Sequence, residues 1–179
     1  AAGVLETTAG QFAFLSTTGL EHAFRTTAAS FRFFALGPAD NVSGFGGVLH
    51  RDIQRVDVRG ISESAVDKCL AGKDPTEVEP GDYDVVLEPF AVTELLEWLS
   101  MTSFGAREVA QGTSCLTGRE GSRILGDNVT LYDSALEEGE DGHGIPFDRE
   151  GTAKRRVEII QNGVALGPVY DRTWGRRMA

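Results

Sequence analysis

Alternating apolar and polar positions dominate the first third of the chain. In residues 11–16 and 30–36, aromatic and aliphatic side chains recur at every second position, which is the pattern of a half-buried strand. Residues 20–26 lie between these runs, after a Ser16-Thr-Thr-Gly19 turn whose glycine can take a positive φ. The pattern therefore predicts an antiparallel meander.

Helical spacing follows in residues 62–71. Apolar residues recur at positions 65, 66, 69 and 70, Ser62 is placed to cap the helix, and Gly72 is placed to end it. Cys69 falls on the apolar face, which favours a buried, inert thiol over a reactive one. Before this helix, the glycines of Gly44-Phe-Gly-Gly47 predict a flexible turn rather than a phosphate-binding loop, because no clear strand precedes them.

A change of pattern near the middle of the chain suggests a boundary. Residues 73–81 contain two prolines and a glycine and are the best candidate for a linker. Residues 82–87 predict a strand. Pro89 then opens a helix with apolar residues at 92, 95, 96 and 99, the spacing of one buried face.

The last clear pattern is a hairpin near the end of the chain. The β-rich runs 157–160 and 164–166 flank Asn162-Gly163, a pair that supplies the positive φ values of a tight turn. Together these elements predict an α+β protein with mixed and antiparallel β-sheets and a few helices.

Composition narrows the choice of partners. The 179 residues carry a formal net charge of -10, which argues against nucleic acid or an anionic membrane as a partner. Cys69 and Cys115 cannot form a disulfide framework, and no window is long and apolar enough to cross a membrane, so we expect a cytoplasmic protein. His143 lies in an acidic, glycine-interrupted run, which is more typical of a solvated loop than of a metal site.

Several unrelated short signals occur in the order found in one family. Residues 85–96 are followed by Gly112-Thr-Ser114, then 131–133, 146–151, 155–157 and 170–172. In this order they resemble the TldD/PmbA family, named for modulation of DNA gyrase and classed with metallopeptidases. The resemblance implies that the chain is an internal fragment. Residues 1–80 would form the C-terminal part of an N-terminal α/β domain, and residues 81–179 the start of a C-terminal, mainly β domain.

The family resemblance also implies where a zinc site should be. In the TldD kind of subunit, the helix after the first strand of the second domain carries HExxxH, whose histidines bind zinc while the glutamate is the general base. The corresponding positions here are Glu97, Trp98 and Thr102, so both histidines and the base are missing. The chain therefore resembles the PmbA kind, also called TldE, with no metal or cofactor of its own and with zinc expected in the partner subunit.

Gly112, Thr113 and Ser114 would, by the same resemblance, line a groove for an extended peptide, whereas the residues themselves favour a purely structural turn. The implied function is that of a non-catalytic subunit of a metallopeptidase complex that degrades unfolded peptides. The implied partners are a zinc-bearing TldD-like paralogue and the peptide. Unpaired strand edges can also pair with a second copy of the chain, so we expect a homo-oligomer as well. A non-enzymatic peptide- or ligand-binding β module is the alternative, and an independent metallopeptidase is a third and lesser option.

Overall fold

The computed structural model describes residues 1–37, 42–135 and 144–178. His143 therefore lies outside the described residues. The chain divides into two compact units. The first unit contains Ala1–Val86 and the described part of Glu137–Thr152, and the second contains the described parts of Leu87–Leu136 and Ala153–Ala179.

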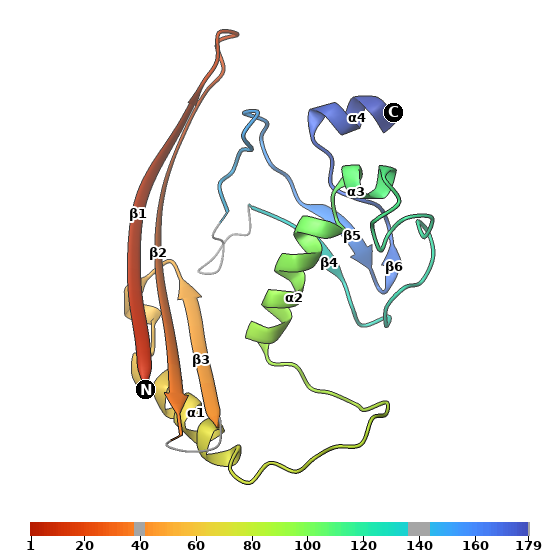
Figure 1. The fold of residues 1–179 in the computed structure, drawn as a ribbon. Coiled ribbons are helices and arrows are strands. Elements are labelled where there is room, and N and C mark those ends of the chain that lie inside the picture. The colour runs from red at the N-terminus through yellow and green to blue at the C-terminus, as the bar shows by residue number, and fades with distance from the viewer. Residues whose placement is uncertain (38–41, 136–143, 179) are drawn as a thin grey trace. The chain divides into compact units, whose positions relative to one another are not determined.

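The first unit is built on a long antiparallel sheet. Its strands are β1 (Ala2–Leu15), β2 (Glu21–Leu36) and β3 (Ser43–His50), in the order β1-β2-β3. The β1–β2 register runs without a shift from Ala2↔Phe34 to Leu15↔Glu21 (Figure 1). At the turn, Gly19 has a φ of 84° and donates its N–H to the Ser16 carbonyl at 3.1 Å. The antiparallel pairing across this turn is confirmed, but residues 20–26 and 30–36, which we predicted as separate runs of a meander, lie along one continuous strand that begins at Glu21, and the third strand of the sheet is β3.

The glycine-rich segment that we predicted to be a turn is part of a strand. Gly44 and Gly46 lie within β3 and are buried beneath helix α1 (Val58–Ala71). A Cβ atom built on Gly44 would lie 1.9 Å from the Ala65 carbonyl oxygen, so the strand needs glycine to let the helix backbone approach. The prediction of a flexible turn was therefore wrong.

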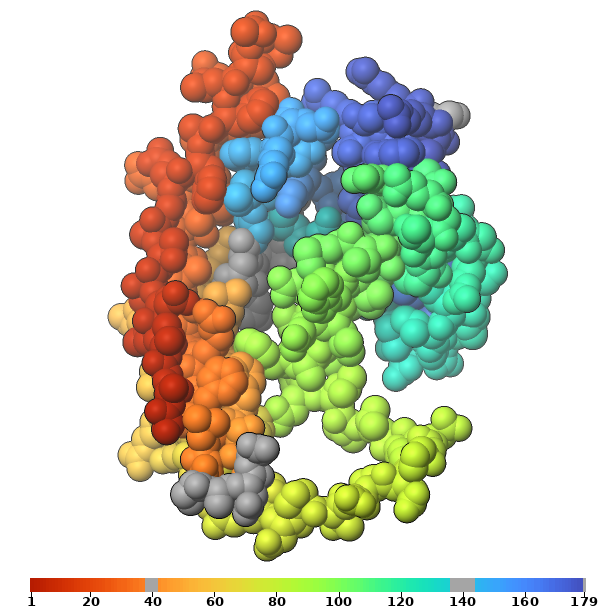
Figure 2. All heavy atoms as spheres, in the orientation of Figure 1, coloured from red at the N-terminus to blue at the C-terminus, as the bar shows by residue number. Residues whose placement is uncertain are grey.

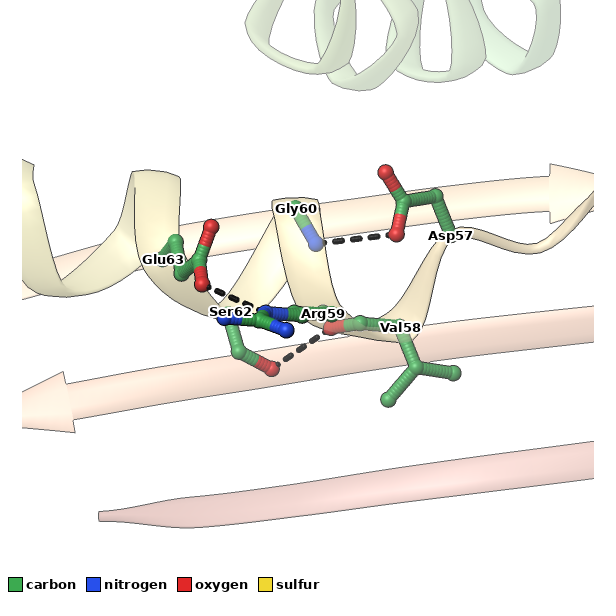
Figure 3. A network of polar contacts seen from close by, with 6 residues as sticks. All are labelled: Asp57, Val58, Arg59, Gly60, Ser62 and Glu63. Carbon is green, nitrogen blue, oxygen red and sulfur yellow. Dashed lines mark hydrogen bonds and ion pairs between the residues drawn. The ribbon is translucent and has the colours of Figure 1, made fainter.

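Helix α1 begins earlier than predicted. Its N-cap is Asp57, whose carboxylate accepts the Gly60 N–H at 2.9 Å (Figure 3). Ser62 is inside the helix and donates its hydroxyl to the Val58 carbonyl at 2.8 Å, so it is not the cap. The helix ends before Gly72 as expected, and Cys69 is buried against Ala35 and Ala65, which confirms the predicted burial.

The segment between α1 and the next helix carries no regular structure. The short 3-10 helix η1 (Ile53–Arg55) lies on the other side of α1, before its start. Residues 82–88, which follow α1, form no strand. Val86 is 98% exposed, and no described strand pairs with this run. The strand predicted there from apolar content was wrong, because a strand requires a hydrogen-bonded neighbour as well as suitable side chains.

The second unit has a small sheet and three helices. The helices are α2 (Pro89–Thr102), α3 (Ala106–Ala110) and α4 (Arg172–Met178); the strands are β4 (Leu131–Asp133), β5 (Val157–Gln161) and β6 (Val164–Ala165), in the order β4-β5-β6. Its buried core consists of Phe104, Leu116, Ile159, Ile160 and Ala165.

The β5–β6 hairpin confirms the prediction made from Asn-Gly. Asn162 has a φ of 48° and Gly163 a φ of 79°, the two positive values that a tight hairpin turn requires. The two sheets and the helices that accompany them make the chain α+β, as predicted. Within the described residues, no helix is both long enough and apolar enough to cross a membrane.

Candidate functional site

Helix α2 is the element that carries the candidate metal-site positions. Pro89 is at its N-terminus, where a missing N–H costs nothing, and Glu88 before it is extended. Of the residues predicted to form its buried face, Leu96 and Leu99 pack on the core of the second unit. Val92 and Leu95 remain 38% and 53% exposed. The prediction of a helix is confirmed, but its buried face is narrower than predicted.

The side chains at the positions where the family resemblance places the zinc motif lie on the exposed part of this helix. Glu97, Trp98 and Thr102 are all exposed, and Trp98 is 61% exposed. The Thr102 hydroxyl donates to the Trp98 carbonyl at 2.8 Å. An indole offers a donor N–H and no ligand lone pair for a metal, so this helix lacks the imidazole pair on which a zinc site of that kind depends.

Within residues 1–37, 42–135 and 144–178, no three side chains of His, Cys, Asp or Glu form a group that could hold a metal ion. Both cysteines are free thiols, Cys69 buried and Cys115 exposed.

The Gly112–Ser114 loop follows α3 and is fixed by one carbonyl. Gly112 has a φ of 76°, and no atom lies within 4 Å of the position where a Cβ would be. The backbone N–H groups of Thr113 and Ser114 both donate to the Glu108 carbonyl, at 3.0 and 3.2 Å. Gly112 and Thr113 are exposed, and the Thr113 hydroxyl donates to the same Glu108 carbonyl at 3.3 Å.

Ser114 differs from its two neighbours because it is buried. Its hydroxyl donates to the Ser103 carbonyl at 2.6 Å and accepts the Leu116 N–H at 2.9 Å, and its residue exposure is 8%. The structure thus joins Ser114 to Ser103, the C-cap of α2 and the residue that follows Thr102, through the Ser114 hydroxyl. Glu97 and Trp98 lie farther back along the same helix.

One cavity of about 400 Å³ lies elsewhere, in the first unit. Its lining includes Ala35, Val42, Val66 and Cys69, between β2 and α1. The lining is mainly apolar, and none of the residues predicted to form a site belongs to it. Sequence periodicity gave no sign of this cavity, since it depends on how closely α1 approaches the sheet.

A long antiparallel sheet with one helix against it, followed by a hairpin unit with its own helices, defines a two-unit α+β protein. Residues 80–179 match the family model described as the PmbA/TldA metallopeptidase C-terminal domain. The chain therefore belongs to the PmbA/TldD family.

Individual proteins are also similar to this chain. An uncharacterized protein of Methanocaldococcus jannaschii is 33% identical over 88 residues, which are 49% of this chain and 21% of that protein. Two solved structures share the fold. A protein of Thermotoga maritima described as a candidate modulator of a DNA gyrase has a TM-score of 0.86 at 20% identity, over 98% of this chain and 41% of its own. TldE from Thermococcus kodakarensis has a TM-score of 0.77 at 22% identity, over 97% of this chain and 40% of its own. The chain thus spans about two-fifths of the length of these solved proteins.

Proposed function

We propose that this chain is part of a PmbA/TldE-like subunit of a metallopeptidase complex, in which it helps to form a peptide-binding chamber and a zinc-bearing TldD-like paralogue cleaves the peptide. One observation carries the proposal. The family-matched region contains the helix expected to bear HExxxH, but α2 has Glu97, Trp98 and Thr102 at those positions. Without these ligands α2 cannot hold zinc in the way that motif does, and a paralogue that carries HExxxH would supply the metal.

The groove-lining role of the Gly112–Ser114 loop remains part of this proposal. The N–H groups of Gly112 and Thr113 already donate to the Val109 and Glu108 carbonyls, so in this proposal the carbonyls of these two exposed residues would accept hydrogen bonds from an extended peptide. Ser114 would contribute indirectly, since its hydroxyl holds the loop against the end of α2. We further propose a cytoplasmic setting, because both cysteines are unpaired, and we expect no nucleic-acid partner for a chain with a net charge of -10.

The test is to measure bound zinc and hydrolysis of unfolded peptides for the protein alone, for an HExxxH-bearing paralogue alone and for their mixture. We expect activity to require the paralogue, zinc to be found in the paralogue, and the two proteins to elute together in a fixed ratio. Stoichiometric zinc with hydrolysis by the protein alone would refute the proposal. Peptide binding without any association with the paralogue would instead favour the non-enzymatic binding module.

A further inference from the structure

Helix α2 has more apolar surface than the core of its own unit covers. Leu96 and Leu99 face that core, but Leu95, Trp98 and Met101 are 53%, 61% and 58% exposed. A helix that is apolar on most of its circumference is normally covered on more than one side. In Figure 2 atoms of α2, in light green, are visible on the face that is drawn. The exposed residues therefore need an explanation other than packing within the described fold.

The exposed positions follow the spacing of a helix-packing seam. Ala91, Leu95, Trp98 and Thr102 are spaced by four, three and four residues, and all four are exposed; we call this row the outer seam. A 4-3-4 spacing keeps side chains on one stripe of a helix, as in the a and d positions of a heptad. The Thr102 hydroxyl is already bonded to the Trp98 carbonyl, so its methyl group can pack without leaving a polar group unsatisfied.

Charge beside the seam indicates what kind of helix would fit. If Leu95 and Thr102 take the a positions, Glu94 takes a g position, where charged residues face the neighbouring helix. Helix α2 contains Glu94 and Glu97 but no Lys or Arg, and no ion pair joins either carboxylate to another described residue. A second copy of α2 would bring the same carboxylate, Glu94, to this contact, whereas a cationic helix would complement it.

We propose that the outer seam is a docking surface for a helical segment of another polypeptide, one that presents an apolar row flanked by Lys or Arg. Trp98 and Leu95 would be its apolar anchors, because large aromatic residues at the centre of a contact carry most of the binding energy. Glu94 would favour a partner helix that carries Lys or Arg beside its apolar row. This docking surface does not depend on the proposed peptidase role.

The probe is a synthetic helical peptide with Leu at the a and d positions and Lys at e and g, with a second peptide carrying Glu at e and g as its control. Calorimetric titration of the protein with each peptide gives the two dissociation constants. We expect saturable binding of the Lys peptide, at least about tenfold tighter than that of the Glu peptide. In a Trp174→Phe background, binding should also shift the emission of Trp98 to shorter wavelength, because its indole leaves water.

Matched variants separate the seam from a general attraction to an acidic protein. Trp98→Ala should weaken Lys-peptide binding about tenfold or more, while Trp174→Ala, on α4, should leave it unchanged. Glu94→Lys should weaken binding about three- to fivefold, while Glu97→Lys, with the same change of net charge away from the seam, should have a smaller effect. Circular dichroism of each variant checks that α2 still folds.

Three outcomes would overturn the proposal. The first is equal binding of the Lys and Glu peptides, or binding of neither. The second is Trp98→Ala binding the Lys peptide as well as the unmodified protein does. The third is a concentration-dependent dimer that Trp98→Ala abolishes, which would assign the seam to a second copy of this chain. None of these depends on zinc or on hydrolysis, so the docking surface and the peptidase role can fail separately.

Discussion

Substituting Gly44 by alanine tests the closest backbone approach in the first unit. A Cβ atom at Gly44 would lie 1.9 Å from the Ala65 carbonyl oxygen and 2.6 Å from the Cys69 nitrogen, both in the backbone of α1. Neither atom can rotate away as a side chain can. The helix and strand would have to separate until the shorter distance reached at least 3.0 Å, and this would open the packing of Ala65 and Cys69 on Ala35.

The expected cost follows from the kind of atom in the clash. Adding a methylene to a packed core costs about 1–3 kcal/mol when neighbouring side chains can give way. The atoms that would meet a Cβ at Gly44 belong to the backbone and cannot give way. We therefore expect Gly44→Ala to lower the free energy of unfolding of the first unit by about 3 kcal/mol or more. Gly10→Ala, in β1 of the same sheet, is the control. Its nearest atom would be 3.6 Å away, an ordinary contact, so its effect should stay within about 1 kcal/mol and can be stabilising.

The assay has to report on the first unit, since Trp98 and Trp174 both belong to the second. Urea unfolding followed by far-ultraviolet circular dichroism gives the global midpoint, and hydrogen exchange of Val58–Ala71 reports on α1 itself. If Gly44→Ala kept the exchange protection of α1 and unfolded at the same urea concentration as Gly10→Ala, the close packing of α1 on β3 would be refuted.

Three further predictions concern a cap, a buried hydroxyl and a strand edge. Asp57→Ala should cost about 1 kcal/mol of stability through loss of the N-cap bond, whereas Ser62→Ala should change stability by less than about 0.5 kcal/mol, as thermal unfolding would show. Ser114→Ala should cost about 1–3 kcal/mol, because it leaves two backbone groups without their partner, and Thr113→Ala should be close to neutral in the same measurement. We also propose self-association through β1, a strand at one edge of its sheet; light scattering should show a mass that rises with concentration, and Thr8→Lys should suppress this rise.

Local signals in the sequence predicted an element correctly where the conformation of a segment depends mainly on its own residues. The Asn162-Gly163 turn and the helix opened by Pro89 were predicted correctly, because turn geometry and a proline at N1 depend on few neighbours. The start of α1 was missed because Asp57 and Ser62 are both good caps, and residues 58–61 carry too little apolar pattern to choose between them.

Features that depend on distant segments could not be predicted from local pattern. Gly44 resembles a turn glycine in the sequence, yet its role is to make room for a helix that follows later in the chain. The burial of Ser114 likewise depends on the Ser103 carbonyl at the end of α2. The positions of Glu97, Trp98 and Thr102 came from the family resemblance rather than from periodicity. Their place on an exposed helix face became visible only in the structure.

Helix α2 shows how one apolar pattern can serve two surfaces. Periodicity assigned Leu95 and Leu96 to the same buried face, but only Leu96 packs on the core of the second unit, and Leu95 begins the exposed row that continues to Trp98. Adjacent residues point about 100° apart on a helix, so two neighbouring leucines can belong to different faces. A single-face interpretation combined two stripes, one that packs on the core of the second unit and one that is exposed. The exposed stripe contains Trp98, the position at which the family resemblance would place the general base of the metallopeptidase motif.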